Sequence, residues 1–237
     1  MIEWLVAGPF TSIGITLLAY CVALGMYDLS GQSTLANPVL FGMAIVIAYL
    51  AITDTPYERY FQGAQVIHFL LGTATVALAV PLYQYIHHLK RALVPIVLSV
   101  FSGALAASLS AVVTAAWLGG STLTQLSLAS KSTTTPVAMA ITEQLGGLPA
   151  LTAVAVIVTG ILGAIGALTV LRLVGVNDPK TQGLALGVAA HGIGTAQALK
   201  VSRELGAYAG LAMGLSALFT ALLVPALWYL LAPLLAP

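Results

Sequence analysis

The chain has 237 residues, of which 8 are Lys or Arg and 7 are Asp or Glu. Charged residues make up 6% of the chain and hydrophobic residues 59%, whereas roughly 25% of an ordinary soluble domain is charged. This composition excludes a water-soluble domain, a disordered chain and a coiled coil, and the net charge of +1 excludes a nucleic-acid binder.

The remaining class is an all-α polytopic membrane protein. At about 20 residues per helical span, the length allows at most about eight to ten spans and leaves no room for a separate soluble domain. We therefore expect residues 1–237 to form a single membrane domain. Cys21 is the only cysteine, so no intrachain disulfide can form, and Glu3 with no basic segment near it predicts that the first apolar run is not a cleaved signal peptide.

Charged and turn-forming residues divide the chain into continuous apolar runs, which are typical of helices and not of barrel strands. The runs are residues 4–27, 29–53, 60–89, 92–130, 148–171, 182–199 and 205–237. Asn37-Pro38 predicts a helix start inside the second run, and Gly119-Gly120 predicts a break inside the fourth. The pattern predicts seven to eight transmembrane or re-entrant helices, and segment 120–144 can either span the membrane or be re-entrant.

Few charges are available to orient the chain in the membrane. The segment 87–91, His-His-Leu-Lys-Arg, is the best candidate for the cytoplasmic side. If every element spans, Lys200 and Arg203 are also cytoplasmic. If 120–144 is re-entrant, Arg172 and Lys180 are cytoplasmic instead, and both topologies stay open.

A short internal similarity predicts a repeat. Residues 53–56, Thr-Asp-Thr-Pro, recur as Thr-Thr-Thr-Pro at 133–136, and residues 101–103 align weakly with 190–192. The predicted repeat units are residues 37–118 and 121–204, in opposite orientation. Inverted repeats with broken helices are common in secondary transporters.

The first segment whose side chains could bind a ligand is residues 130–136, Ser-Lys-Ser-Thr-Thr-Thr-Pro. Lys131 lies 12 residues from both Gly119 and Glu143, or about 18 Å along a helix, which predicts an ammonium near the bilayer centre. Pro136 predicts a break followed by a half-helix. The ammonium, the free N–H groups and the hydroxyls would together suit an anion; the hydroxyl residues are Ser132, Thr133, Thr134 and Thr135. The alternative is that Lys131 reaches solvent from a short re-entrant loop while the hydroxyls cap a helix.

The second such segment is residues 190–197, Ala-His-Gly-Ile-Gly-Thr-Ala-Gln. Gly192 and Gly194 weaken a helix and allow another backbone to approach. His191 could carry a proton or donate to a carboxylate, with Thr195 and Gln197 as further polar candidates. The alternative is a packing face with a hydrogen-bonded core histidine.

Acidic residues near these segments have two interpretations. Asp54, Glu58 and Arg59 can simply mark a helix boundary, with Asp54 as the cap of the following helix. If the repeat is real, Asp54 instead pairs with Lys131 when no substrate is bound, and Glu143 is a second candidate for coupling or an ion pair. No His/Cys cluster, phosphate loop or nucleophile with a base occurs, so we predict no metal, no cofactor and no enzymatic activity.

Three stretches resemble the LrgB/CidB family of antiholin-like membrane proteins, which is related to a plastid glycolate/glycerate translocator. They are KSTTTPVAMAITEQLGGLPALTAVAVIVTGILGA, GLALGVAAHGIGTAQAL and, earlier, YFQGAQVIHFLLGTATVALAVPLYQ. Together they cover most of the chain from Tyr60 to Leu199. The family's Lys-Ser-x-Thr-Thr-Pro motif falls on residues 131–136, and its His-Gly-Ile-Gly-Thr motif on residues 191–195.

The resemblance implies a multi-pass protein of the bacterial inner membrane that exports or exchanges small carboxylates such as glycolate, glycerate, lactate or pyruvate. It equally implies the alternative of a holin-like or antiholin-like regulator of murein hydrolase activity and cell lysis. It further implies a small LrgA/CidA-type membrane partner, and we expect a homo-oligomer. Three departures stand out: Thr73 replaces a usual proline, Gln197 a common basic residue, and Lys200 a frequent acidic one.

Overall fold

The computed structural model describes residues 9–33, 36–77, 83 and 92–235. Nine helices and no strand are present in these ranges, in agreement with the predicted all-α class. The chain divides into two compact units, residues 1–78 and 79–237, which are described separately. The segment 87–91, on which the predicted cytoplasmic side rests, lies outside the described residues. The predicted repeat units 37–118 and 121–204 stay a prediction.

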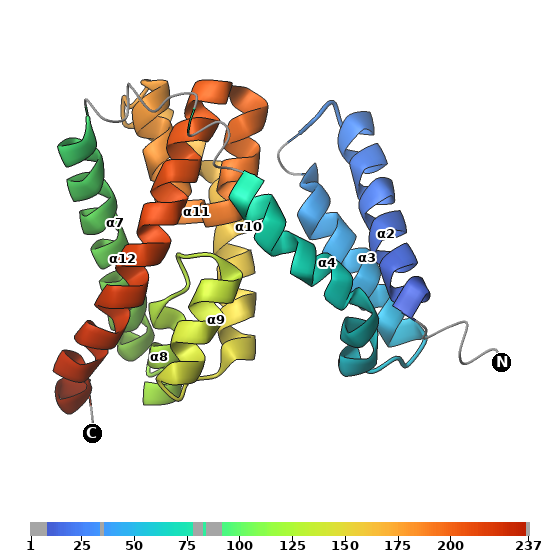
Figure 1. Ribbon diagram of the computed structural model, residues 1–237, viewed down its shortest axis with the longest axis horizontal. Helices are drawn as coiled ribbons and strands as arrows, with labels where there is room; N and C mark the ends of the chain where they lie inside the picture. Colours follow the sequence, from blue (N-terminus) through green and yellow to red (C-terminus); the bar gives the residue numbers. More distant parts are fainter. Residues whose placement is uncertain (1–8, 34–35, 78–82, 84–91, 236–237) are drawn as a thin grey trace. The chain divides into compact units, whose positions relative to one another are not determined.

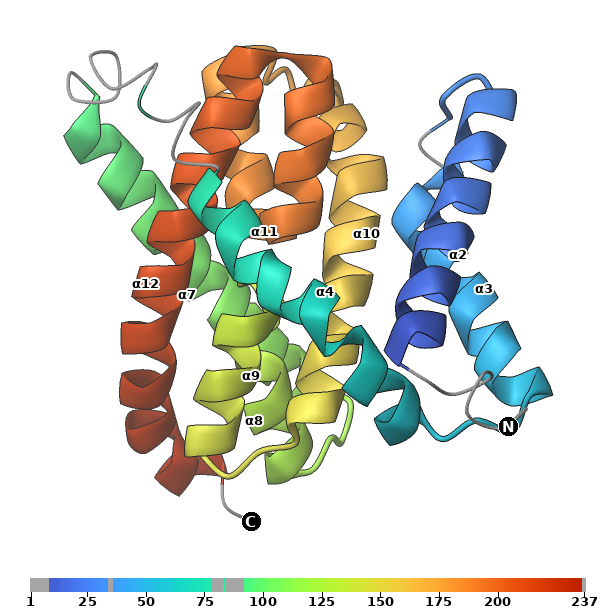
Figure 2. The same ribbon diagram turned by 45° about the vertical axis from the view of Figure 1, so that its right-hand side comes forward.

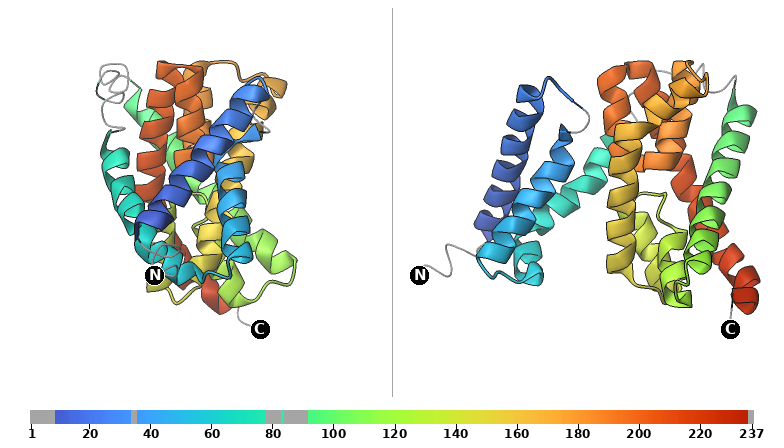
Figure 3. Two further views of the ribbon diagram at one scale, coloured as in Figure 1. Left: turned by 90° about the vertical axis from the view of Figure 1, so that its right-hand side faces the viewer. Right: turned by 180° about the vertical axis from the view of Figure 1, so that it is seen from behind.

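The first unit contains α2 (Pro9–Leu29), α3 (Pro38–Ile52) and α4 (Tyr57–Ala77). α2 and α3 lie side by side (Figure 3). The predicted helix start at Asn37-Pro38 is confirmed, because the Asn37 side chain accepts hydrogen bonds from the N–H groups of Val39 and Leu40 at 2.9 and 3.4 Å. Asp54 lies in the turn after α3, with a φ of 49° and an exposed side chain.

The described residues of the second unit form six helices of eight residues or more. They are α7 (Leu93–Trp117), α8 (Thr122–Ala129), α9 (Thr135–Gln144), α10 (Pro149–Leu173), α11 (Pro179–Val201) and α12 (Arg203–Leu235). The breaks predicted at Gly119-Gly120 and before Pro136 are both confirmed. Gly119 has a φ of 76°, and a Cβ on Gly120 would lie 2.8 Å from the Ala115 carbonyl oxygen, so both turn positions favour glycine.

α8 and α9 form an antiparallel hairpin, called hairpin 1 below. The Ser130 hydroxyl at the end of α8 donates to the Ala138 carbonyl in α9 at 3.2 Å, while Ser127, one turn earlier, accepts from the Leu148 N–H at 2.9 Å. The arms of 8 and 10 residues are about 12 and 15 Å long, too short to cross a bilayer core of about 30 Å. Segment 120–144 could either span the membrane or be re-entrant, and the short arms of hairpin 1 match the re-entrant alternative.

α11 is also a hairpin, called hairpin 2 below, and it corrects the prediction of one span over residues 182–199. His191 has a φ of 39° and a ψ of −128°, which reverses the chain inside the element. Leu186 and Ala198 belong to one buried cluster, although a straight helix would separate them by about 18 Å. The arms close because Gly194 has no side chain: a Cβ there would lie 2.9 Å from the Leu186 carbonyl oxygen.

The two hairpins lie at opposite ends of the second unit, hairpin 1 at the lower end in Figure 1 and hairpin 2 at the upper end (Figures 1 and 2). Four helices in the described residues are long and apolar enough to cross a membrane. They are Phe10–Leu29, Leu93–Trp117, Pro149–Leu173 and Arg203–Leu230. The predicted count of seven to eight elements crossing or entering the membrane is not confirmed by these four.

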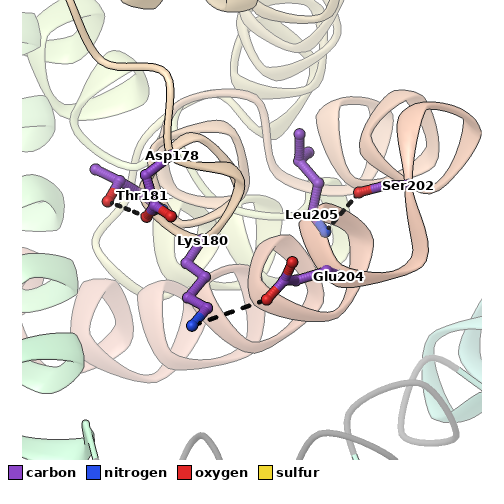
Figure 4. Close-up of polar contacts among 6 residues, drawn as sticks. All are labelled: Asp178, Lys180, Thr181, Ser202, Glu204 and Leu205. Atoms are coloured by element: carbon purple, nitrogen blue, oxygen red, sulfur yellow. Dashed lines mark hydrogen bonds and ion pairs between the residues drawn. The ribbon is translucent and has the colours of Figure 1, made fainter.

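Asp178 caps the N-terminus of α11, where hairpin 2 begins. Its carboxylate accepts hydrogen bonds from the N–H and the hydroxyl of Thr181 at 2.9 and 2.8 Å (Figure 4). These bonds lower the pKa of the Asp178 carboxyl below its usual value, with a smaller effect from Lys180. Lys180 itself lies 3.9 Å from Glu204 at the start of α12 (Figure 4).

We expect Asp178→Ala to destabilise the second unit by about 1 kcal/mol, as for other lost N-caps, and Asp178→Asn, which keeps the cap and removes the charge, to have a smaller effect. Because the folded-state pKa of Asp178 is depressed, its charge stabilises the fold above the unfolded-state pKa, and that contribution is lost as the pH falls through the folded-state pKa. Thermal unfolding of the two variants in detergent, at pH 7 and at about pH 3, measures both effects. Equal midpoints for wild type and Asp178→Ala at pH 7 would contradict the prediction.

Candidate functional site

The tips of the two hairpins meet beside the same stretch of α10. Tip 1 is residues 130–134 and tip 2 is residues 190–192. The Thr152 hydroxyl donates to the Ser127 carbonyl of hairpin 1 at 2.8 Å, and the Val156 carbonyl bonds the His191 ring of tip 2 at 2.9 Å. Thr152 and Val156 are one helical turn, about 6 Å, apart. The two hairpins that carry the motifs singled out in the sequence are therefore bonded to neighbouring turns of α10.

Tip 1 combines a cation with free hydrogen-bond donors. Lys131 is half-buried, its Nζ lies 3.4 Å from the Ser132 hydroxyl, and no carboxylate of the described residues forms a salt bridge with it. The Thr133 hydroxyl is buried and has no hydrogen-bond partner among those residues. Thr134 precedes α9 without a side-chain capping bond, so the first-turn N–H groups of α9 are open to a ligand. An ammonium, hydroxyls and a helix N-terminus in one place can bind a small anion.

A buried hydroxyl network holds hairpin 1 against α10. The Thr152 and Thr142 hydroxyls lie 2.9 Å apart, within hydrogen-bond distance, and those of Thr142 and Ser130 are 3.2 Å apart. Ser127 links the hairpin to the start of α10 through the Leu148 N–H. Ser127, Thr142 and Thr152 were missed by sequence reasoning; isolated Ser and Thr in an apolar run are the only signal for them. Because each hydroxyl satisfies another, the network fixes the position of tip 1.

Tip 2 is centred on the His191 imidazole. Its Nε2 carries the hydrogen in the bond to Val156, because a carbonyl oxygen can only accept. The Thr195 hydroxyl donates to the His191 carbonyl at 2.8 Å. A Cβ on Gly160 of α10 would lie 2.7 Å from the imidazole Cε1, so only glycine leaves room for the ring. Gly192 and Gly194 both follow the reversal at His191, and the second arm of α11 starts here with its N-terminus at the tip.

We expect His191→Ala to destabilise the second unit by about 1–3 kcal/mol, because it removes a buried hydrogen bond and the ring that packs against Gly160. His191→Gln keeps an N–H donor and should recover part of the loss. Thermal unfolding in detergent compares the variants, with His191→Gln as the matched control. Wild-type stability of His191→Ala would show that the bond to Val156 contributes nothing to holding the tip.

Two other predicted residues of the second unit, Gln197 and Glu143, lie away from the tips. Gln197 is half-buried on the second arm of α11, six residues or about 9 Å beyond His191. Glu143 is exposed near the far end of α9. Asp54 is exposed in the first unit, so its pairing with Lys131 stays a prediction. No group of three or more His, Cys, Asp or Glu residues in the described ranges could hold a metal ion.

Comparison with known proteins places this architecture in a family. The LrgB-like family matches residues 16–230 of the chain. The chain belongs to the LrgB-like family. Among relatives of this LrgB-like protein, YwbG of Bacillus subtilis (strain 168) is 36% identical over 214 residues, covering 90% of this chain and 95% of the relative. No solved structure matches the chain.

Two further relatives carry a functional name. The antiholin-like protein LrgB of Bacillus cereus (strain B4264) is 30% identical over 217 residues, covering 92% of this chain and 94% of its own length. The antiholin-like protein LrgB of Bacillus anthracis (strain CDC 684 / NRRL 3495) matches equally. The family resemblance predicted from residues 131–136 and 191–195 is therefore confirmed. Of the three noted departures, the Thr73 side chain lies outside the described part of the structure.

Proposed function

We propose that this LrgB-like protein is a secondary transporter of small carboxylates in the bacterial inner membrane. The observation that carries the proposal is the half-buried Lys131 ammonium, which has no salt-bridged carboxylate among the described residues and lies where two helical hairpins meet. A charge at such depth is costly unless a partner or water meets it. A carboxylate substrate is a partner of the right sign, and it can leave again.

The proposed binding residues come from both tips. The carboxylate lies against the Lys131 ammonium and the N-terminus of α9, with hydroxyls supplied by Ser132, Thr133, Thr134 and Thr135. Backbone groups of Gly192, Gly194 and Thr195 close the site from tip 2, and His191 holds that tip against α10. In a site with little water these contacts are stronger than at a surface.

Alternating access follows from the same geometry. Each hairpin enters from one end of the unit and closes off the tip region from that end (Figure 1). If hairpin 1 or hairpin 2 moves while the other stays, the site opens to one side at a time, as in transporters with broken helices near the midplane. An opposite orientation of the two halves, which the sequence also predicts, would make the two movements equivalent.

A second candidate function is an antiholin-like regulator of murein hydrolase activity and cell lysis. The names of the two relatives at 30% identity support it more directly than they support transport. Such a protein would act by assembly, with itself as a homo-oligomer and with a small LrgA/CidA-type membrane partner. An assembly of this kind has no need of an unpaired ammonium at the tip of a hairpin, which is the observation favouring transport.

Uptake of labelled glycolate, lactate and pyruvate into proteoliposomes tests the proposal. We expect saturable uptake that unlabelled carboxylate inside the vesicles accelerates by exchange. Vesicles without protein, and vesicles with a labelled neutral compound of similar size, are the controls. Release of both anionic and neutral solutes alike would indicate a pore and favour the holin-like function, and absence of any uptake would overturn transport.

A further inference from the structure

One face of α12 carries two hydroxyl residues in an otherwise apolar helix. Met213, Ser216, Thr220 and Val224 follow at spacings of three and four, so they lie on the same side of the helix. All four are buried, with exposed fractions of 5%, 1%, 3% and 2%. Buried polar side chains in a membrane helix mark functional positions by default.

The contacts at the two ends of this face show where it lies along α12 relative to the two hairpins. Met213 lies at tip 2, because its Sδ is 3.8 Å from the Thr195 hydroxyl and 3.9 Å from a Cβ placed on Gly192. Val224 belongs to a buried cluster with Ala129 and Ile141 of hairpin 1. Ser216 is about 4.5 Å past Met213 and about 12 Å before Val224 along the helix. It therefore lies at the level between the two tips.

The Ser216 hydroxyl has no hydrogen-bond partner in the described part of the protein. Two other buried hydroxyls of the second unit bond the carbonyl four residues earlier: Ser127 bonds Leu123 at 2.7 Å, and Thr195 bonds His191 at 2.8 Å. A buried hydroxyl without a partner is unfavourable, because it has lost its hydrogen bonds to water. Ser216 and Thr133 of tip 1 are the two buried side-chain hydroxyls without a partner among the described residues.

We propose that Ser216 is a substrate-binding residue that bonds the hydroxyl group of a 2-hydroxycarboxylate and so selects hydroxy acids over plain carboxylates. This inference rests on the proposed transport function. The Lys131 ammonium and the α9 N–H groups only donate, so they suit the carboxylate. A serine hydroxyl donates and accepts, and so does the hydroxyl of the substrate. A site built for a substrate hydroxyl disfavours the analogue that lacks it, because its own polar group is then left unpaired.

Competition between glycolate and acetate for uptake into proteoliposomes tests the inference, because the two differ only by the hydroxyl. We expect wild type to prefer glycolate and Ser216→Ala to lower this preference by about tenfold. Ser110→Ala is the matched control: Ser110 is an exposed serine of α7 whose hydroxyl already bonds the Ala107 carbonyl at 3.1 Å. It should keep the wild-type preference.

Thermal unfolding of the purified proteins with glycolate or acetate gives a second readout that does not depend on transport. Glycolate should raise the midpoint of wild type more than acetate does, and the difference should vanish in Ser216→Ala. If Ser216→Ala fails to fold, Ser216→Cys, which keeps the shape with a weak donor, takes its place and should lose most of the difference. An unchanged preference in a folded Ser216 variant would overturn the inference alone. A wild type that neither transports nor is stabilised by any carboxylate would overturn the proposed function itself.

Discussion

Lys131→Gln is expected to abolish carboxylate uptake, by at least about 100-fold, while the protein stays folded in the membrane. The ammonium is the one cation at the meeting point of the hairpins within the described residues. A neutral amide of similar length cannot balance the charge of a carboxylate in a site with little water, and hydrogen bonds to charged groups contribute about 1.5–3 kcal/mol where neutral ones contribute less. Folding should persist, because Lys131 contributes no ion pair to the fold.

The control for Lys131→Gln is the same substitution at Lys180. That ammonium is 45% exposed and pairs with Glu204 at 3.9 Å, and an exposed ion pair of this kind contributes at most about 1 kcal/mol. Lys180→Gln should therefore keep most of the uptake. Wild-type uptake rates in Lys131→Gln would remove the basis of the proposed function, and loss of lysis control without loss of uptake would favour the antiholin-like alternative.

Gly187→Ala is expected to be the most damaging single methyl addition in the second unit. A Cβ at this position would overlap the Ala209 carbonyl oxygen and lie 2.8 Å from the Ala212 Cβ. Gly187 is in the first arm of α11, and both atoms that its Cβ would meet belong to α12, against which this arm packs closely. Backbone atoms cannot give way as a flexible side chain can, so we expect a loss of about 3 kcal/mol and little folded protein.

Gly166→Ala is the matched control for Gly187→Ala. Gly166 is also inside a helix, but a Cβ there meets no atom within 4 Å. The substitution should stabilise α10 slightly, because alanine favours a helix over glycine by about 1 kcal/mol. Yield of monodisperse protein and the unfolding midpoint in detergent compare the two. Equal behaviour of both variants would show that the close approach of α11 and α12 does not limit stability.

Local features of the fold were predictable because they depend on few neighbouring residues. Asn37-Pro38 starts a helix since Asn37 caps it and proline fits its first turn. The breaks at Gly119-Gly120 and before Pro136 follow from a positive φ and from a missing N–H. The candidate anion site was likewise predictable in part, because a lysine among hydroxyls next to Pro136 combines a charge with an open helix end.

The reversal at His191 could not be predicted from its neighbours. A histidine with a φ of 39° is unfavourable by about 1–3 kcal/mol and persists only when its surroundings impose it. The imposing contacts are distant in sequence: Val156 bonds the ring, and Gly160 leaves space for it. The segment 182–199 therefore resembled one long span, and only packing against α10 and α12 made it a hairpin.

The sequence alone determined that this is a helical membrane protein of the LrgB-like family and where several of its helices break, because hydropathy and backbone preferences act over short distances. Only the tertiary structure decided which way the chain runs after each break, since that depends on contacts between residues far apart. The same reason holds for the site. Lys131 and His191 are 60 residues apart, and Ser216 has no local signature, so only the packing of hairpin 1, hairpin 2, α10 and α12 could bring them to one level.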